Sequence, residues 1–288
     1  MPKVPQKGVA TLPGMPESRQ ETTDRVMWHD ASRKRDVPVK LHVPATSPAP
    51  VVIVSHGIGG DRDSYAYLGR ALASAGFLAV HLTHAGTDRA VLERGYLHLY
   101  RAVKEKENWI NRPLDVRFAL DQLENDRRAD LDHVAVVGHS AGAFTAFAVA
   151  GLRAGDGPAM RDERVKAIVP MSMPRMNGII PPGGYDAIGI PVLNMTGTCD
   201  ASLIYRTLPR HRRIPFEDTA ATGHYLVTIR GVNHDTFSAV SAPHKELIAS
   251  VTAAFLRGFL LGEPEARRWF DDAGRAALHG TVLTVERK

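Results

Sequence analysis

A serine between glycines is the feature of this sequence that most clearly suggests chemistry. Residues 138–142 read Gly-His-Ser-Ala-Gly, which matches the pattern G-x-S-x-G. They follow small and β-branched apolar residues at 134–137 and precede a nearly all-apolar stretch at 141–152. A strand, a sharp turn and a helix in this order expose a serine hydroxyl, and the glycines remove side chains that would collide with it. We therefore predict that Ser140 is a nucleophile.

The acid and the base that such a serine needs occur later in the chain. Asp200 and His234 each come directly after an apolar run that is typical of a buried strand. In a Ser-His-Asp site the imidazole takes the serine proton and passes it to the leaving group, while the carboxylate fixes the tautomer of the imidazole. We predict these two residues as acid and base. His224 is a second candidate for the base, whereas Asp186 and Asp218 do not follow a predicted strand.

A glycine-rich loop after the first long apolar run supplies the remaining part of an acyl-transfer site. Residues 55–60 read Ser-His-Gly-Ile-Gly-Gly. Acyl transfer builds negative charge on the carbonyl oxygen, and preorganised backbone N–H groups stabilise that charge. We predict that the amides of Ile58 and Ala141 are these donors. Gly57 and Gly59 would let the backbone approach the substrate closely.

Continuous apolar runs alternate with helical patterns along the chain. Continuous runs suit strands that are buried on both faces of a parallel sheet. They occupy residues 51–54, 77–80, 134–137, 165–169, 191–195 and 225–229. Helical patterns lie at residues 65–75, from Pro113 to Leu123, at 141–152 and at 247–259. The alternation predicts an α/β fold with a mostly parallel, doubly wound sheet and helices on both faces.

The N-terminal part of the chain has a different texture. Residues 1–22 are rich in Pro, Gly and polar residues, which predicts a loose arm. Residues 26–28 and 37–43 flank a polar, charged turn and predict an antiparallel hairpin ahead of the parallel strands. We find neither an internal repeat nor a strong linker. Residues 23–288 are therefore predicted to form a single domain.

Composition excludes several classes of function. The 288 residues are 44% hydrophobic and 23% charged, as in ordinary globular proteins. The net charge of +5 comes largely from clusters at 33–35 and 206–213, which we interpret as solvated surface. A nucleic-acid partner is not expected, because binding a phosphate backbone needs a broader positive face. Cys199 is the only cysteine, so an intramolecular disulfide is excluded.

Localisation and cofactors follow from what the sequence lacks. No window approaches the ~20 apolar residues of a membrane span, and no signal-peptide pattern is visible. We expect a cytoplasmic protein, with a trimmed export signal as the alternative. No H-E-x-x-H motif or Cys/His cluster is present, so neither a metal nor a cofactor is expected. The sequence does not indicate an oligomeric state.

At this point the chain resembles a known superfamily. It is similar to the dienelactone-hydrolase-like and platelet-activating-factor-acetylhydrolase-like branch of the α/β-hydrolases, and to cutinase-like polyester hydrolases. The resemblance rests on residues 36–39, 55–60 with 65–68, 112–116, the serine motif, 197–200, and His234 with Phe237. It implies the α/β-hydrolase fold and metal-free ester hydrolysis through an acyl-enzyme. The chain departs from true dienelactone hydrolases, whose nucleophile is cysteine, and lacks the paired cysteines of many secreted cutinase-like enzymes.

Substrate preference is indicated only in outline. Residues 84–112 and 173–189 follow predicted strands and carry apolar and aromatic side chains, which favour an acyl or aryl group. We predict a small-molecule ester with a short to medium acyl or aryl group, in contact with Gly57, Gly59, Tyr65 and Met173. The alternatives are a cofactor-free haloperoxidase or perhydrolase, a polyester hydrolase, and a hydrolase-like binding protein without turnover.

Overall fold

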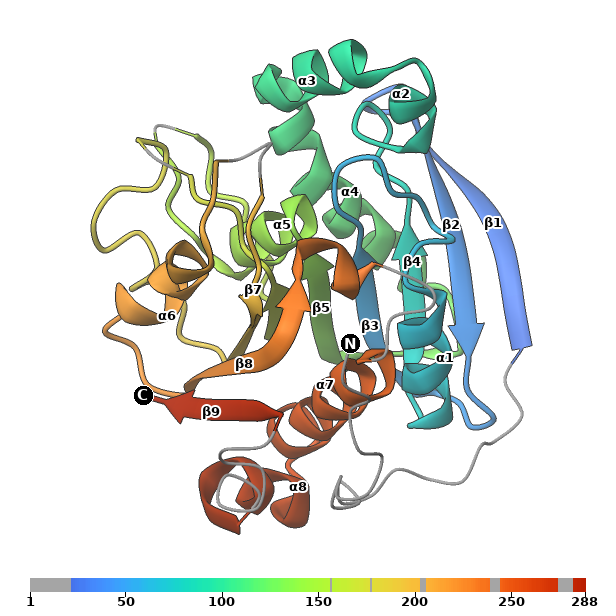
Figure 1. Ribbon diagram of the computed structural model, residues 1–288. Coiled ribbons are helices and arrows are strands. Elements are labelled where there is room, and N and C mark those ends of the chain that lie inside the picture. Colours follow the sequence, from blue (N-terminus) through green and yellow to red (C-terminus); the bar gives the residue numbers. More distant parts are fainter. Residues whose placement is uncertain (1–21, 156, 177, 203–205, 239–243, 274–281) are drawn as a thin grey trace.

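The computed structural model describes residues 22–288 except 156, 177, 203–205, 239–243 and 274–281. The residues it describes contain one sheet with the strand order β1-β2-β4-β3-β5-β6-β7-β8-β9 (Figure 1). Strands β3 to β8 run parallel, whereas β1, β2 and β9 join antiparallel. The strands are β1 (Thr22–Asp30), β2 (Arg35–Val43), β3 (Ala49–Ser55), β4 (Leu78–Leu82), β5 (Ala129–His139), β6 (Val165–Met171), β7 (Val192–Cys199), β8 (His224–Asn233) and β9 (Leu283–Arg287).

Helices cover both faces of the sheet, because neighbouring residues of a central strand point to opposite sides. Val52 and Val54 of β3 pack with α1 (Ala66–Ser74) and α7 (Lys245–Phe259). Val51 and Ile53 pack with α4 (Lys106–Leu123) and α5 (Ala141–Ala150). The shorter helices are α2 (Arg89–Glu93), α3 (Tyr96–Lys104), η1 (Pro209–Arg213), α6 (Ile214–Glu217), η2 (His234–Phe237), α8 (Pro264–Arg268) and η3 (Trp269–Ala273).

Most sequence-based expectations for the elements are confirmed. Each predicted apolar run coincides with one of the strands β3 to β8, and the predicted hairpin is β1 and β2 with Asp30 opposite Arg35. The predicted arm falls outside the described residues up to position 21, and β1 begins at Thr22. The mostly parallel sheet with an N-terminal antiparallel hairpin therefore follows the predicted pattern.

The prediction that Pro113 opens a helix is wrong. Helix α4 begins at Lys106 and carries Pro113 inside it. A proline at this place removes one helical hydrogen bond and costs ~3 kcal/mol or more. Tertiary contacts on the preceding turn offset this cost. Trp109 packs edge-on against Phe144, with ring centroids 5.2 Å apart, and the side-chain amide of Asn108 donates to the Ala102 carbonyl at 2.9 Å.

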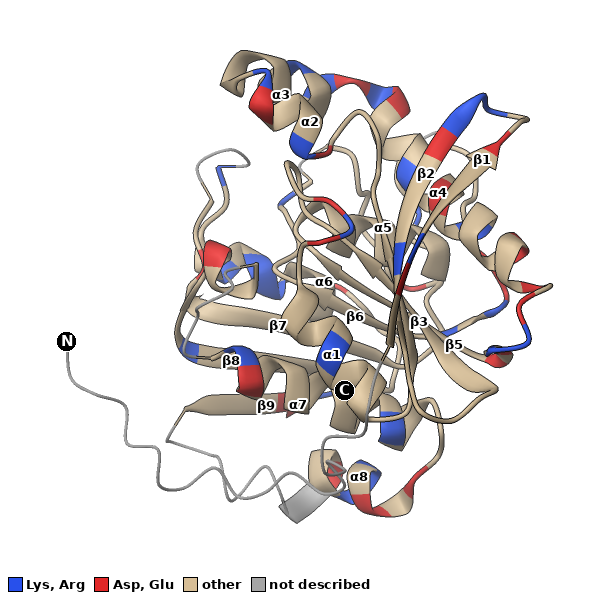
Figure 2. Ribbon diagram, turned by 90° about the vertical axis from the view of Figure 1, so that its right-hand side faces the viewer, with Lys and Arg blue, Asp and Glu red and all other residues tan. Residues whose placement is uncertain are grey.

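Lys and Arg positions are intermixed with Asp and Glu positions along the chain (Figure 2). The interpretation of residues 33–35 and 206–213 as solvated surface is only partly correct. The side chains of Arg33 and Arg35 are 17% and 14% exposed, and both pair with the buried carboxylate of Asp115. Arg212 is fully buried. Three arginines from these clusters therefore point into the protein.

No single helix in the described part of the chain is long and apolar enough to cross a membrane. The bent pair formed by 245–259 and 264–271 meets the length and composition criteria together.

Candidate active site

The serine motif forms a tight turn between β5 and α5. Ser140 has φ 56° and ψ −117°, a strained conformation for a residue with a side chain. Its neighbours must be glycine because backbones touch there. A Cβ on Gly138 would lie 2.0 Å from the Gly142 carbonyl oxygen, and one on Gly142 would lie 2.0 Å from the Ser55 carbonyl oxygen. The turn thus presses the serine-bearing helix against the end of β3.

Ser140, Asp200 and His234 come together at the carboxyl ends of parallel strands. His234 opens η2 directly after β8, and Asp200 follows β7. His234 Nε2 lies 3.1 Å from Ser140 Oγ, and His234 Nδ1 lies 3.2 Å from Asp200 Oδ1. This is the geometry of a nucleophile, a base and an orienting acid. His224, the second candidate for the base, is buried at the other end of β8 and contacts the Ile188 carbonyl.

Two backbone hydrogen bonds tie the strand ends at this site together. The Ser140 amide donates to the Met171 carbonyl at 2.9 Å, and the Ser172 amide donates to the Met195 carbonyl at 2.7 Å. These bonds continue the sheet past the ends of β5 and β6. Ser140 is therefore held in register with the neighbouring strands.

Ser172, which the sequence analysis did not identify, lies between His234 and Asp200. Its backbone has φ 55°, and its Oγ lies 2.7 Å from His234 Nδ1 and 2.8 Å from Asp200 Oδ1. The Nδ1–H of His234 can donate to this hydroxyl, which in turn donates to the carboxylate. Ser172 thus adds a second route for orienting the imidazole.

Arg212 was also missed, although it touches both the acid and the base. Its buried guanidinium lies 3.1 Å from Asp200 Oδ1 and donates to the Ser172 and Met173 carbonyls at 3.0 and 2.8 Å. Burial raises the pKa of Asp200, but the hydrogen bond from His234 and the charge of Arg212 outweigh it and hold that pKa below its usual value. The acid is therefore kept ionised inside the protein.

The position of Arg212 creates two options for the imidazole of His234. Nη2 of Arg212 lies 3.0 Å from Nδ1. If Arg212 donates to Nδ1, the proton sits on Nε2 and the ring cannot accept one from Ser140. If Nδ1–H donates to Ser172 or Asp200, Nε2 is free to accept. The contacts to Ser172 and Asp200 favour this second, productive tautomer.

The two predicted oxyanion donors have no competing acceptor. The amides of Ile58 and Ala141 make no hydrogen bond to any part of the chain that the structure describes. Around them, the Gly59 amide donates to Thr87 and the Gly60 amide to Gly57. The loop is thus held in place while these two N–H groups stay available to an incoming carbonyl oxygen.

Glycines 57 and 59 allow the oxyanion loop to lie close to the nucleophile. A Cβ on Gly57 would lie 3.2 Å from the Ser140 Cβ. Gly59 has φ +78°, which side chains rarely adopt, and a Cβ there would lie 3.1 Å from Leu92 of α2. The loop therefore lies between the tight turn at Ser140 and helix α2.

Tyr65 and His139 brace the site from below. The Tyr65 hydroxyl accepts from the Gly57 amide at 3.3 Å and donates to His139 Nδ1 at 2.7 Å. Burial holds the pKa of His139 well below its usual value, so this ring is neutral. Tyr65 and Met173 are only 4% and 3% exposed, so both side chains are buried behind the site and do not face solvent.

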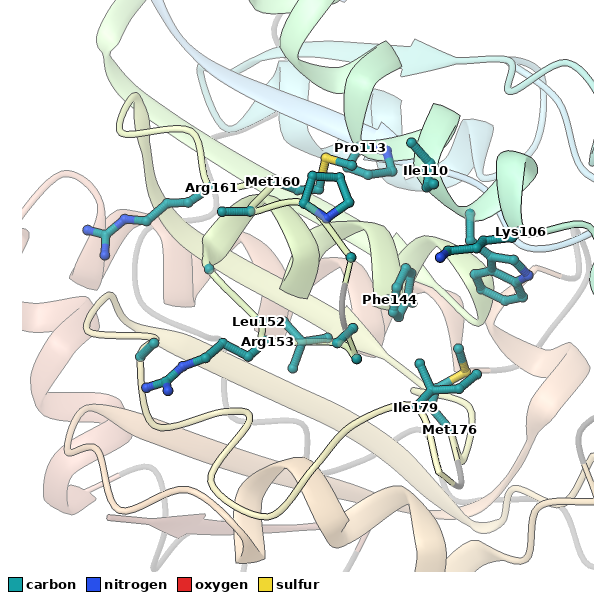
Figure 3. A pocket seen from close by; sticks show the side chains of 18 of the residues that line it. Lys106, Ile110, Pro113, Phe144, Leu152, Arg153, Met160, Arg161, Met176 and Ile179 are labelled. Atoms are coloured by element: carbon teal, nitrogen blue, oxygen red, sulfur yellow. The ribbon is translucent and has the colours of Figure 1, made fainter.

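A cavity of about 1000 Å³ runs alongside α5 (Figure 3). It begins at Phe144, one helical turn beyond Ser140, and continues past the end of the helix to Leu152. Apolar side chains of α4 and of the segment after β6 line it, while Arg153 and Arg161 extend away from them. Ser140, Asp200 and His234 do not line the cavity. Its apolar lining includes Trp109, Ile110, Pro113, Phe144, Met160, Met176 and Ile179.

The cavity draws on both segments that were expected to contact substrate. From residues 84–112 it takes Trp109 and its neighbours, and from residues 173–189 it takes Met176 and Ile179. Among the described residues, no group of three or more His, Cys, Asp or Glu side chains could hold a metal ion.

Comparison with known proteins agrees with this architecture. The chlorophyllase family model matches residues 17–169, just over half of the chain. No curated protein sequence matches. Among solved structures, the chain is similar to a ferulic acid esterase from Streptomyces cinnamoneus, with a TM-score of 0.65 and 19% sequence identity. The match covers 89% of this chain and 93% of the esterase. This likeness and the strand order confirm the predicted α/β-hydrolase fold.

Proposed function

The chain belongs to the chlorophyllase family, and on this premise we propose that it is a serine esterase that hydrolyses carboxylic esters. Ser140 is the nucleophile, His234 the general base and acid, and Asp200 the orienting carboxylate. The observation that carries the proposal is the 3.1 Å contact of Ser140 Oγ with His234 Nε2, close to two amides without a partner among the described residues.

The first half-reaction forms an acyl-enzyme. Ser140 Oγ attacks the ester carbonyl while its proton passes to His234 Nε2. The negative charge on the carbonyl oxygen is stabilised by the amides of Ile58 and Ala141. The tetrahedral intermediate then collapses, the bond to the alcohol oxygen breaks, and His234 gives the proton to that oxygen.

The second half-reaction regenerates the enzyme. A water molecule attacks the acyl carbonyl while His234 takes one of its protons. Collapse of the second tetrahedral intermediate releases the carboxylic acid and returns the proton to Ser140. Through both halves, Asp200 and Ser172 keep Nδ1 protonated, and the charge of Arg212 keeps Asp200 ionised.

The substrate of this proposal is an ester with an apolar acyl or aryl group. The cavity beside α5 supports this choice, since it is largely apolar and begins one turn from the nucleophile. The volume of the cavity exceeds what an acetyl group needs, so medium acyl chains should be turned over better than acetate. The family's name makes chlorophyll one test substrate, and the similarity to a ferulic acid esterase makes a ferulate ester another.

The test is hydrolysis of p-nitrophenyl acetate, butyrate, octanoate and laurate, of methyl ferulate and of chlorophyll. Purified Ser140→Ala is the control. We expect hydrolysis of at least one of these esters, and a loss of ~10⁴ to 10⁶ in kcat for Ser140→Ala. Wild-type protein that hydrolyses none of them would refute the proposal. Retention of more than about a tenth of kcat in Ser140→Ala would remove Ser140 as the nucleophile.

A further inference from the structure

Arg112 lies in the core of the protein directly behind the oxyanion loop. Its side chain projects from α4 and is 1% exposed. The guanidinium spreads over three separate segments. Nη2 donates to the His56 carbonyl and to Ser55 Oγ, Nη1 donates to Thr87 Oγ1 at 2.7 Å, and Nε donates to Thr145 Oγ1 at 3.1 Å.

These contacts connect Arg112 to the backbone segments that carry the two predicted oxyanion donors. The His56 carbonyl lies two residues before Ile58. Thr145 accepts from Arg112 and donates its hydroxyl proton to the carbonyl of Ala141 at 3.1 Å. One guanidinium therefore joins the loop that carries one donor to the helical turn that carries the other.

The third segment bound by Arg112 also touches the oxyanion loop. Thr87 accepts from Arg112 through its hydroxyl and from the Gly59 amide through its carbonyl, the latter at 2.8 Å. The loop is thus held on both sides of Ile58. A planar fork with five donors can make such a set of contacts at once, whereas the single ammonium of lysine cannot.

A buried polar network holds the acceptors of Arg112 in orientation. Ser55 Oγ lies 2.9 Å from His84 Nε2, and His84 Nδ1 donates to Asp115 at 2.9 Å. The His84 amide donates to His56 Nε2 at 2.9 Å. Asp115 also forms an ion pair with the guanidinium of Arg35. The hydroxyl of Ser55 is therefore fixed to accept from Arg112.

We propose that Arg112 is a positioning residue for the oxyanion hole. Its guanidinium sets the spacing between the amides of Ile58 and Ala141. The inference rests on the proposed esterase function. Arg112 does not touch the substrate, so its loss should weaken binding of the transition state and leave binding of the ground-state ester nearly unchanged. That pattern separates positioning from a general loss of structure.

The main experiment compares Arg112→Lys and Arg112→Ala with wild type on the best ester, with active sites counted by an organophosphonate. We expect kcat to fall ~10²-fold, close to the loss of one oxyanion donor. KM should stay within about threefold. The inhibition constant of an aryl boronic acid, whose tetrahedral adduct places an oxygen in the hole, should rise in parallel with the loss in kcat. Millimolar guanidinium should restore part of the activity of Arg112→Ala but not of wild type.

A second pair of variants keeps the test valid if the Arg112 variants do not fold. Thr145→Val removes the hydroxyl that joins Arg112 to Ala141. Thr252→Val is the matched control, because the Thr252 hydroxyl is also buried and also bonds the carbonyl four residues earlier, Ile248, but in α7 on the other face of the sheet. We expect Thr145→Val to lose about tenfold in kcat and Thr252→Val to keep it.

Three results would overturn the inference. One is kcat within about threefold of wild type in both Arg112→Lys and Thr145→Val. Another is a loss confined to KM. The third is an equal loss in Thr145→Val and Thr252→Val. A wild-type protein that hydrolyses no ester would overturn the proposed function together with this inference, whereas an active wild type with these results overturns the inference alone.

Discussion

Acidification should destabilise this protein well before its carboxylates protonate, because at least four buried histidines are held neutral. His56, His81, His84 and His139 are at most 4% exposed. Burial lowers the pKa of His81 to about 3 and that of His84 to about 4. It holds the pKa values of His56 and His139 well below the usual value. In the unfolded chain all four would titrate near ~6.5.

The sign and size of the effect follow from linkage. Below pH ~6.5 the unfolded chain binds protons that the folded chain does not, so stability is full above that pH and falls as the pH drops toward the folded pKa values. At pH ~5 each of His81 and His84 has cost about 1.5 × 1.36, or ~2 kcal/mol. His81 and His84 together then cost ~4 kcal/mol, and His56 and His139 add to this loss in the same direction. The whole stability of a domain is of order 5–15 kcal/mol.

The assay is urea unfolding followed by tryptophan fluorescence at pH ~7.5, ~6 and ~5, with the free energy of unfolding extrapolated to water. His81→Asn serves as the internal test, since its amide nitrogen can still donate to the Ser64 carbonyl that His81 Nδ1 contacts at 3.1 Å. This variant should lose ~2 kcal/mol less than wild type between the first and last pH. A stability that is constant down to pH ~5, or that falls only below ~4 where carboxylates titrate, would refute the reasoning.

Three further predictions concern the site. Ser172→Ala should lower kcat about tenfold to a hundredfold at constant KM, because the variant loses the hydrogen bonds that join Ser172 to His234 and to the charged carboxylate of Asp200. Steady-state kinetics would show this loss, and an unchanged kcat would contradict the role of Ser172. Arg212→Met should lower the free energy of unfolding by ~3–5 kcal/mol in urea, since it leaves the carboxylate of Asp200 buried without its counter-charge; a loss below ~1 kcal/mol would contradict that role. Gly142→Ala should abolish labelling of Ser140 by a phosphonate, because the new Cβ would collide with the Ser55 carbonyl and displace the turn that holds Ser140. Normal labelling would show that this turn tolerates the displacement.

The framework of the fold was predictable because its signals are local. Each strand of the parallel core contains a run of mostly apolar, buried residues, and each long helix has its own apolar pattern. Ser140 was singled out from the glycines around it, and Asp200 and His234 from their place after strands; the structure places the side chains of Ser140 and Asp200 within hydrogen-bond distance of His234. These are patterns of a few neighbouring residues, and the chain's topology converts them into one site.

The supporting residues of the site could not be identified in the same way, because their roles depend on partners far away in the chain. Arg212 lies in a basic cluster that looks solvated, yet it is buried beside Asp200. Ser172 carries no motif and gains its position from a left-handed backbone conformation after β6. Arg112 was noted only as part of a resemblance, since its acceptors come from three distant segments. The start of α4 was predicted wrongly for the same reason, because contacts with distant residues such as Phe144 keep the helix intact ahead of Pro113.

The hydrogen bonds from the Ser140 and Ser172 amides to the ends of the next strands have a consequence for engineering. They make the catalytic backbone an extension of the sheet, whereas much of the cavity wall comes from connecting segments such as 151–161 and 176–187. We expect changes in those segments to leave the register that places Ser140 unchanged. If the protein is the esterase proposed above, a library of variants restricted to the cavity wall should change which esters are accepted while preserving the fraction of enzyme that a phosphonate can label. Selectivity and turnover in this protein are then separable targets for directed evolution.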